Sequence, residues 1–128
     1  MKFLKPFDEP IFAAMRVVLA FLYMMHGWQK AFGIFGGHMY PITTQLGVAG
    51  WLETILGPLI GVGWFTSWAA FVASGEMAFG YFIGHYPRGP LPANNGGDIA
   101  VALCFAFLYI AVRGGGALSV DAIVRKRR

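Results

Sequence analysis

Seven polar side chains in or beside apolar stretches are the residues of this sequence best suited to chemistry. Glu53 and Glu76 stand at the two ends of a long run without charged residues, and His26 and Lys30 are spaced one helical turn apart. A carboxyl group can exchange protons, while imidazole and ammonium groups can donate hydrogen bonds to a carbonyl oxygen. The spacing predicts one polar pocket, made of His26, Gln29, Lys30, Glu53, Glu76, His85 and Asp98.

The elements that carry these residues are too apolar for a water-soluble domain. Of the 128 residues, 57% are hydrophobic and 12% are charged, whereas soluble domains have about 25% charged residues. No Asp, Glu, Lys or Arg occurs between Glu53 and Glu76 or from Ile99 to Val112. The composition therefore predicts an all-α integral membrane protein, because apolarity on all sides favours helices over barrel strands.

Four apolar stretches are long enough to be membrane spans. They cover about residues 11–30, 46–63, 68–85 and 98–113, and Pro10 precedes the first one. They predict a four-helix bundle that forms a single domain over residues 1–128. The Pro-containing loop 86–97 cannot be helical throughout. Residues 118–128, with Ser119 as a cap, predict a short cationic segment at the membrane interface.

The distribution of cations predicts the orientation of the chain. An even number of spans puts both termini on one side, with seven cations there against two, Lys30 and Arg88, on the other side. The positive-inside rule therefore places both termini in the cytoplasm. The seven are Lys2, Lys5, Arg113, Arg125, Lys126, Arg127 and Arg128. Basic residues beside a bilayer indicate contact with anionic lipid, not with nucleic acid.

Ionisable residues within the spans need partners in the interior. Each costs roughly 2.5–3.5 kcal/mol at the centre of a helix that faces lipid. Lys30 suits Glu53, because the first span ends where the second begins, whereas no cation is evident for Glu76. Arg16, a structural ion, lies about one and a half turns into its span, where its side chain could reach the interface. Asp98 could also simply complement the first turn of its helix, and Lys30 and His85 could be ordinary interface residues.

Glycines at four-residue spacing predict close helix packing. Gly57 and Gly61 share one stripe of the second span, and Gly80 and Gly84 share one of the third. The single Cys104 lies in an apolar run, so neither a disulfide nor a metal site is expected.

Four ordered motifs resemble the DoxX family of small bacterial membrane proteins. They are Arg16-x3-Ala20-x2-Tyr23-x2-His26-Gly27-x2-Lys30, Glu53-x3-Gly57-x3-Gly61, Asn95-Gly96-Gly97-Asp98 and Gly114-x4-Ser119-Val120-Asp121. The resemblance covers nearly the whole chain, although Ala20 stands where the family often has Gly, and Asp98 where Glu is common. It implies an inner-membrane protein linked to thiosulfate:quinone oxidoreductase and to sulfur or oxidative-stress chemistry.

Three functions remain open from the sequence, and the sequence does not decide whether this chain is an enzyme. The first is a redox-linked subunit that binds a quinone head group in the polar pocket, with His26 and Lys30 as donors and Glu53 as the acid. The second is a non-catalytic subunit that packs against a larger membrane complex through its aromatic residues. The third, less favoured, is a haem held by His26 and His85.

Overall fold

A computed structural model of the chain describes residues 1–127, and all of the regular structure in that range is helical. The predicted spans coincide with α1 (Asp8–Phe32), α2 (Gln45–Val62), α3 (Thr66–Gly80) and α5 (Asp98–Arg113). A π-helical turn, η2 (Tyr81–His85), extends α3. The shorter elements are the 3-10 helices η1 (Lys2–Phe7) and η3 (Tyr86–Arg88), and the helices α4 (Pro92–Asn95) and α6 (Val120–Lys126).

Two helical stretches are long and apolar enough to cross a membrane by themselves. They are Lys2–Phe32, which joins η1 and α1, and Gln45–Val62, which is α2. The helices α3 and α5 are shorter, with 15 and 16 residues. Large apolar side chains on the short helices are nevertheless exposed, including Trp68 at 74% and Phe105 at 65%. Such an outer surface is typical of contact with lipid.

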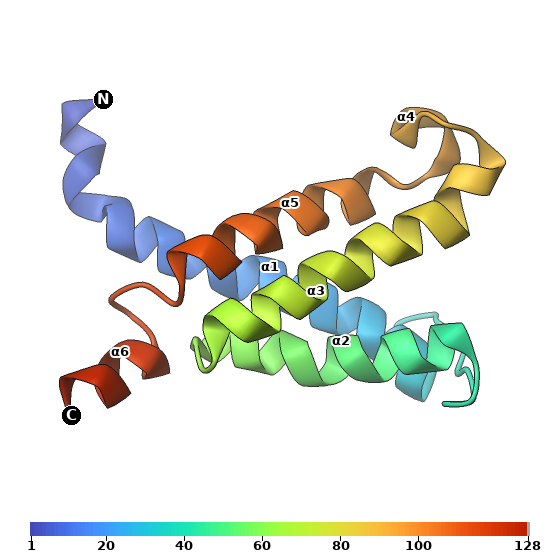
Figure 1. Ribbon diagram of the computed structural model, residues 1–128, viewed down its shortest axis with the longest axis horizontal. Coiled ribbons are helices and arrows are strands. Elements are labelled where there is room, and N and C mark those ends of the chain that lie inside the picture. Colours follow the sequence, from blue (N-terminus) through green and yellow to red (C-terminus); the bar gives the residue numbers. More distant parts are fainter. Residues whose placement is uncertain (128) are drawn as a thin grey trace.

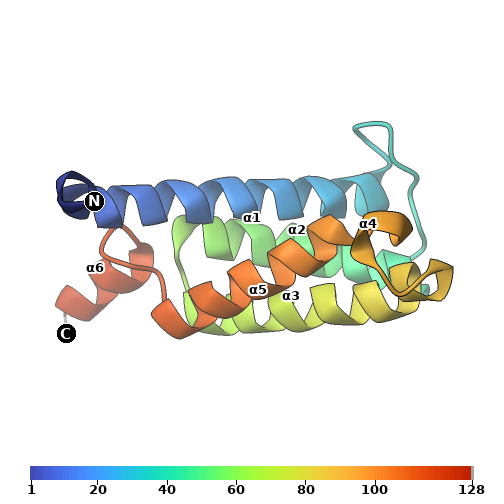
Figure 2. The same ribbon diagram turned by 90° about the horizontal axis from the view of Figure 1, so that it is seen from above.

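The long helices pack as two pairs that diverge from one end of the molecule. The helix α1 lies along α2, and α3 lies along α5. A short corner, Gly63–Phe65, joins α2 to α3, and from there the two helices separate (Figure 1). Both termini lie at the corner end, as the view from above also shows (Figure 2).

Close packing of α1 on α2 depends on small residues. A Cβ atom on Gly27 would lie 2.7 Å from the Cβ of Glu53, and one on Gly57 would lie 2.8 Å from the Cβ of Met24. The predicted role of Gly57 in helix packing is therefore confirmed, and Gly61 is in ordinary contact with Ala20 at 3.6 Å. The backbones approach closely because these positions carry no side chain.

The corner is held by the segment that follows α5. Asp121 accepts hydrogen bonds from the backbone N–H groups of Phe65 and Thr66, both at 2.9 Å, and from the Thr66 hydroxyl at 2.7 Å. Asp121 thus caps α3, whose preceding residue Phe65 has a positive φ of 49°. The predicted cap of the terminal segment is confirmed, because the Ser119 hydroxyl accepts from the N–H of Ala122 at 3.2 Å.

Arg16 is buried beneath this corner with partners in the interior, as expected of an ionisable residue within a span, and its side chain does not extend to the surface. The residue is only 2% exposed, and its guanidinium group donates hydrogen bonds to the backbone carbonyl oxygens of Gly115, Gly61 and Leu118. Three carbonyl oxygens replace the water that the guanidinium loses on burial. Arg16 therefore connects α1 to the end of α2 and to the segment after α5.

Candidate functional site

The ion pair predicted between Lys30 and Glu53 is present in the structure. The Lys30 ammonium donates to both carboxylate oxygens of Glu53, at 2.6 and 2.8 Å. Glu53 is fully buried, while the side chain of Lys30 is 24% exposed. Gly50 makes room for the pair, because a Cβ atom there would lie 2.7 Å from the Cβ of Lys30. The close contact of α1 with α2 and the ion pair therefore depend on the same small residues.

A second buried contact joins α1 to α3. The Tyr23 hydroxyl donates to Oε2 of Glu76 at 3.1 Å. Tyr23 is fully buried, and its ring packs edge-on against Phe107 of α5, with 5.0 Å between the ring centroids. Tyr23 belongs to the first family motif but is not one of the seven predicted pocket residues. Its hydroxyl supplies the partner that Glu76 lacked, since no cation had been evident for this carboxyl.

His26 and Gln29 lie beside the ion pair without contacting it. The Nδ1 atom of His26 is 2.8 Å from the carbonyl oxygen of Leu22. Gln29 donates from Nε2 to the carbonyl oxygen of Phe35 at 3.2 Å, so it holds the loop after α1. These two residues border the polar cluster formed by Lys30, Glu53, Tyr23 and Glu76.

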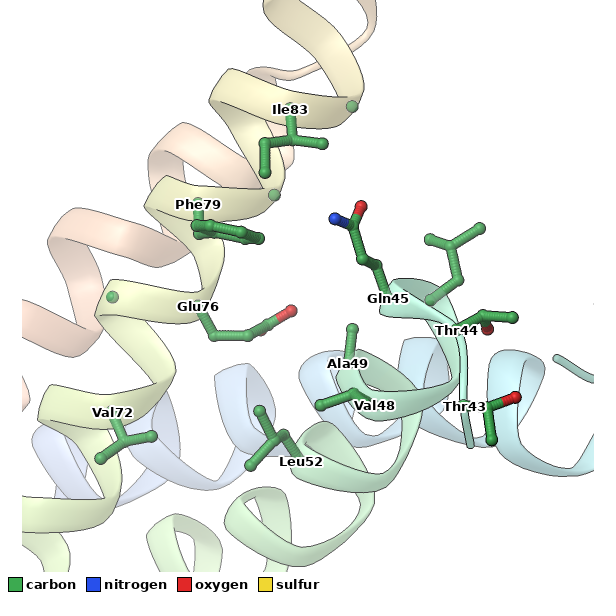
Figure 3. A pocket seen from close by; sticks show the side chains of 14 residues that line it. Thr43, Thr44, Gln45, Val48, Ala49, Leu52, Val72, Glu76, Phe79 and Ile83 are labelled. Carbon is green, nitrogen blue, oxygen red and sulfur yellow. The ribbon is translucent and has the colours of Figure 1, made fainter. Parts of the chain in front are cut away.

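An apolar groove opens where α2 and α3 diverge, with a volume of about 750 Å³. Glu76 is the ionisable residue of its lining, and Figure 3 shows the carboxyl group pointing across the groove toward α2. Apolar side chains form the walls, and polar groups of Thr43, Thr44 and Gln45 lie where α2 begins. The walls include Val48 and Leu52 of α2 and Val72, Phe79 and Ile83 of α3 and η2. One carboxyl group therefore connects the polar cluster to a space accessible from outside the protein.

The predicted packing role of Gly80 and Gly84 is wrong. Both glycines line the groove, and a Cβ atom on either would meet nothing within 4 Å. The small residues of α3 have two different surroundings. Ala69 and Ala73 are buried in the core, whereas Gly80 and Gly84 lie beyond the point where α2 diverges from α3. These glycines widen the groove and do not bring two helices together.

His85 belongs to a separate cluster that holds the loop 86–97. Its Nδ1 atom is 3.1 Å from the carbonyl oxygen of Asn95 and 3.1 Å from Nη2 of Arg88. The buried Asn95 donates to the Tyr81 hydroxyl at 3.1 Å and to the carbonyl oxygen of Gly89 at 2.8 Å. Asn95 was not predicted as a key residue, although the Asn-Gly-Gly run marks the turn that it caps.

Asp98 lies outside both clusters. It is exposed in the first turn of α5, and no hydrogen bond or ion pair of its side chain occurs within residues 1–127. Its position fits the alternative in which it complements the helix dipole. The structure thus divides the seven predicted pocket residues among the polar cluster and its border, the His85 cluster and an exposed helix end.

Two carboxyl groups at the corner end are expected to make the attachment of α6 dependent on pH. Burial alone would raise the pKa of Asp121, but hydrogen bonds from Thr66 and Phe65 lower it below its ordinary 3.8. The backbone N–H of Ala117 and the side chain of Arg113 lower the pKa of Glu9 below 4.5. A lowered pKa in the folded state stabilises the fold above the ordinary pKa, and this stabilisation is lost as the pH falls below it.

We therefore expect residues 117–124 to keep constant protection above about pH 5 and to lose it progressively below about pH 4. Hydrogen exchange of this segment in detergent, corrected for the intrinsic rate, measures the effect. The variant Asp121→Asn should show weak protection at every pH. Equal protection of Asp121→Asn and the original chain at pH 7 would contradict the role of the carboxylate as a cap.

Comparison with known proteins shows the family of this chain. The DoxX family model matches residues 11–86, which contain most of α1, all of α2 and α3, and the polar cluster. The chain is 36% identical over 121 residues to an uncharacterized protein of Haemophilus influenzae, and the match covers 88% of this chain and 90% of the relative. No solved structure matches. The protein belongs to the DoxX family, and the resemblance seen in the sequence is confirmed.

Proposed function

We propose that this DoxX protein binds a quinone in the groove between α2 and α3 and serves as a quinone-associated subunit of a membrane complex. The observation that carries the proposal is the single carboxyl group, that of Glu76, in the lining of a mostly apolar groove. A quinone combines two carbonyl oxygens with an apolar tail, and a volume of about 750 Å³ is within the range of ligand sites. The sequence had favoured His26 and Lys30 as donors, but the groove lining favours Glu76.

The proposed topology is a bundle of four membrane-spanning helices in the bacterial inner membrane. Both termini lie at one end of the molecule, as an even number of spans requires (Figure 1). With η2 included, α3 continues through 20 residues, Thr66–His85. The excess of cations at this end supports a cytoplasmic location for both termini.

In this proposal the chain supplies binding and proton exchange. Reduction of a quinone to a quinol takes up two electrons and two protons, and the electrons come from a redox centre of a partner subunit. The Glu76 carboxyl can pass a proton to a quinone oxygen within hydrogen-bond reach, and the Tyr23 hydroxyl holds the carboxyl in place.

Substitutions in the groove lining test the proposal directly. Gly80→Leu should abolish binding of a soluble ubiquinone analogue to the purified protein, because the new side chain fills the groove without meeting a neighbour. Glu76→Leu should weaken binding about tenfold, because the hydrogen bond from the carboxyl group to a quinone oxygen is lost. Binding is measured by the quenching of tryptophan fluorescence.

The control for both variants is Asp98→Asn, which changes an exposed carboxyl outside the groove and should bind as the original chain does. Unchanged affinity in Gly80→Leu would show that the quinone does not occupy the groove. Purification with a stoichiometric partner protein but without quinone would favour the second function, a non-catalytic subunit that packs through exposed aromatic residues such as Trp68 and Phe105.

A further inference from the structure

The end of the molecule that carries both termini has an excess of unpaired positive charge. Five basic side chains on η1 and α6 are exposed, and none makes an ion pair within the described residues 1–127. They are Lys2, Lys5, Arg125, Lys126 and Arg127. Arg128 lies outside the described residues.

The acidic groups at the same end are already engaged with other partners. Asp8 and Glu9 both pair with Arg113, at 2.9 and 3.0 Å, and Glu9 also accepts from the backbone N–H of Ala117 at 2.6 Å. Asp121 is directed at the first turn of α3. The carboxylates of this end are therefore already bonded within the protein, and the five cations are available to an external anion.

The elements that bear the cations also expose large apolar side chains. Phe3 is 69% exposed and Phe7 55% in η1, and Ile123 is 52% exposed in α6. In Figure 2, η1 is seen nearly along its axis, so it runs across the long axis of α1, while α6 lies at the same end of the molecule. Short helices that carry both basic and apolar side chains at one end of a molecule are typical of segments that lie in the interface of a bilayer.

We propose that η1 and α6 together form a binding surface for the head groups of acidic phospholipids. In Figure 1, η1 lies at the top and α6 at the bottom of the left-hand end, so their cations are spread over a wide area and not gathered around one small anion. Phosphodiester groups accept charge-assisted hydrogen bonds from the lysines and arginines. The exposed apolar residues of both elements contact the upper part of the acyl chains.

Native mass spectrometry of the full chain in detergent tests the surface with phosphatidylglycerol and phosphatidylcholine as probes. We expect phosphatidylglycerol to bind more tightly, and the triple variant Arg125→Gln, Lys126→Gln, Arg127→Gln to lose this preference. Each cation near an anionic surface contributes about fivefold in affinity, so the triple variant should bind at least tenfold more weakly. Added salt should weaken binding to the original chain, because salt screens exposed charges.

Two control variants separate charge and position. Arg88→Gln removes an exposed cation at the opposite end and should bind phosphatidylglycerol as the original chain does. Arg125→Lys with Arg127→Lys keeps the charge and should retain the preference. Glycerophosphoglycerol, the head group without acyl chains, should compete poorly. Equal binding of the two lipids by the original chain, or an unchanged preference in the triple variant, would overturn the proposal without bearing on the quinone groove.

Discussion

Glu53→Gln and Lys30→Met are each expected to lower the free energy of unfolding in detergent by about 3–5 kcal/mol. Each change leaves one member of a buried, doubly hydrogen-bonded pair without its partner. The loss should be larger for Lys30→Met, because Glu53 is fully buried and its charge then has no cation beside it. The double variant should lose less than the sum of the single variants. Denaturant unfolding of the purified chain measures all three.

Lys5→Met is the matched control for this experiment. It removes the same charge from an exposed lysine that makes no ion pair within residues 1–127, and it should change the free energy of unfolding by less than about 0.5 kcal/mol. Strictly additive losses in the double variant would show that Lys30 and Glu53 do not interact in the folded protein.

Gly57→Leu is expected to destabilise the protein by several kcal/mol, whereas Gly80→Leu should leave its stability nearly unchanged. A Cβ atom on Gly57 would lie 2.8 Å from the Cβ of Met24 and 3.2 Å from the carbonyl oxygen of Ala20, so the larger side chain must separate α1 from α2. Overpacking of this kind usually costs about 1–3 kcal/mol and more where backbone must move. A Cβ atom on Gly80 would meet nothing within 4 Å.

The two leucine variants serve as controls for each other, since both replace a glycine within a helix. Thermal unfolding in detergent should separate their midpoints clearly. If Gly80→Leu proved as destabilising as Gly57→Leu, the groove would be closed in the folded protein, and the proposed ligand site would be lost with it.

The helices and the ion pair could be predicted because each leaves a direct signal in the sequence. Long and mostly apolar runs mark α1, α2, α3 and α5, and a membrane-spanning helix requires such runs. The pairing of Lys30 with Glu53 follows from connectivity, because α1 ends where α2 begins. The family could also be recognised from its motifs, since these motifs contain the residues on which the contact between α1 and α2 depends.

The groove could not be predicted, and neither could the separation of the seven predicted pocket residues, because residues of the same type have opposite structural roles at different positions. Small residues at regular spacing permit close packing at Gly57 and leave open space at Gly80. Only the divergence of α2 from α3 distinguishes the two positions. His85 was assigned to the pocket because it ends the third apolar stretch, but the turn η2 and the loop that Asn95 holds give it other partners. The partners of Arg16 could not be predicted, because the carbonyl oxygens that accept its hydrogen bonds belong to residues about 45 to 102 positions away.

The fixed corner between α2 and α3 is a pivot about which the two helices can rotate relative to each other. Arg16 and Asp121 hold the vertex at which the two helices meet, whereas within residues 1–127 no hydrogen bond joins α2 to α3 at the opposite end. An arm as long as α2, with 18 residues, measures about 27 Å, so a rotation of about 4° at the vertex shifts its far end by about 2 Å. A small rearrangement at the corner is thus amplified at the groove mouth. The width of the groove mouth, and with it the size of a ligand that the proposed site could accept, would then depend on residues at the other end of the protein.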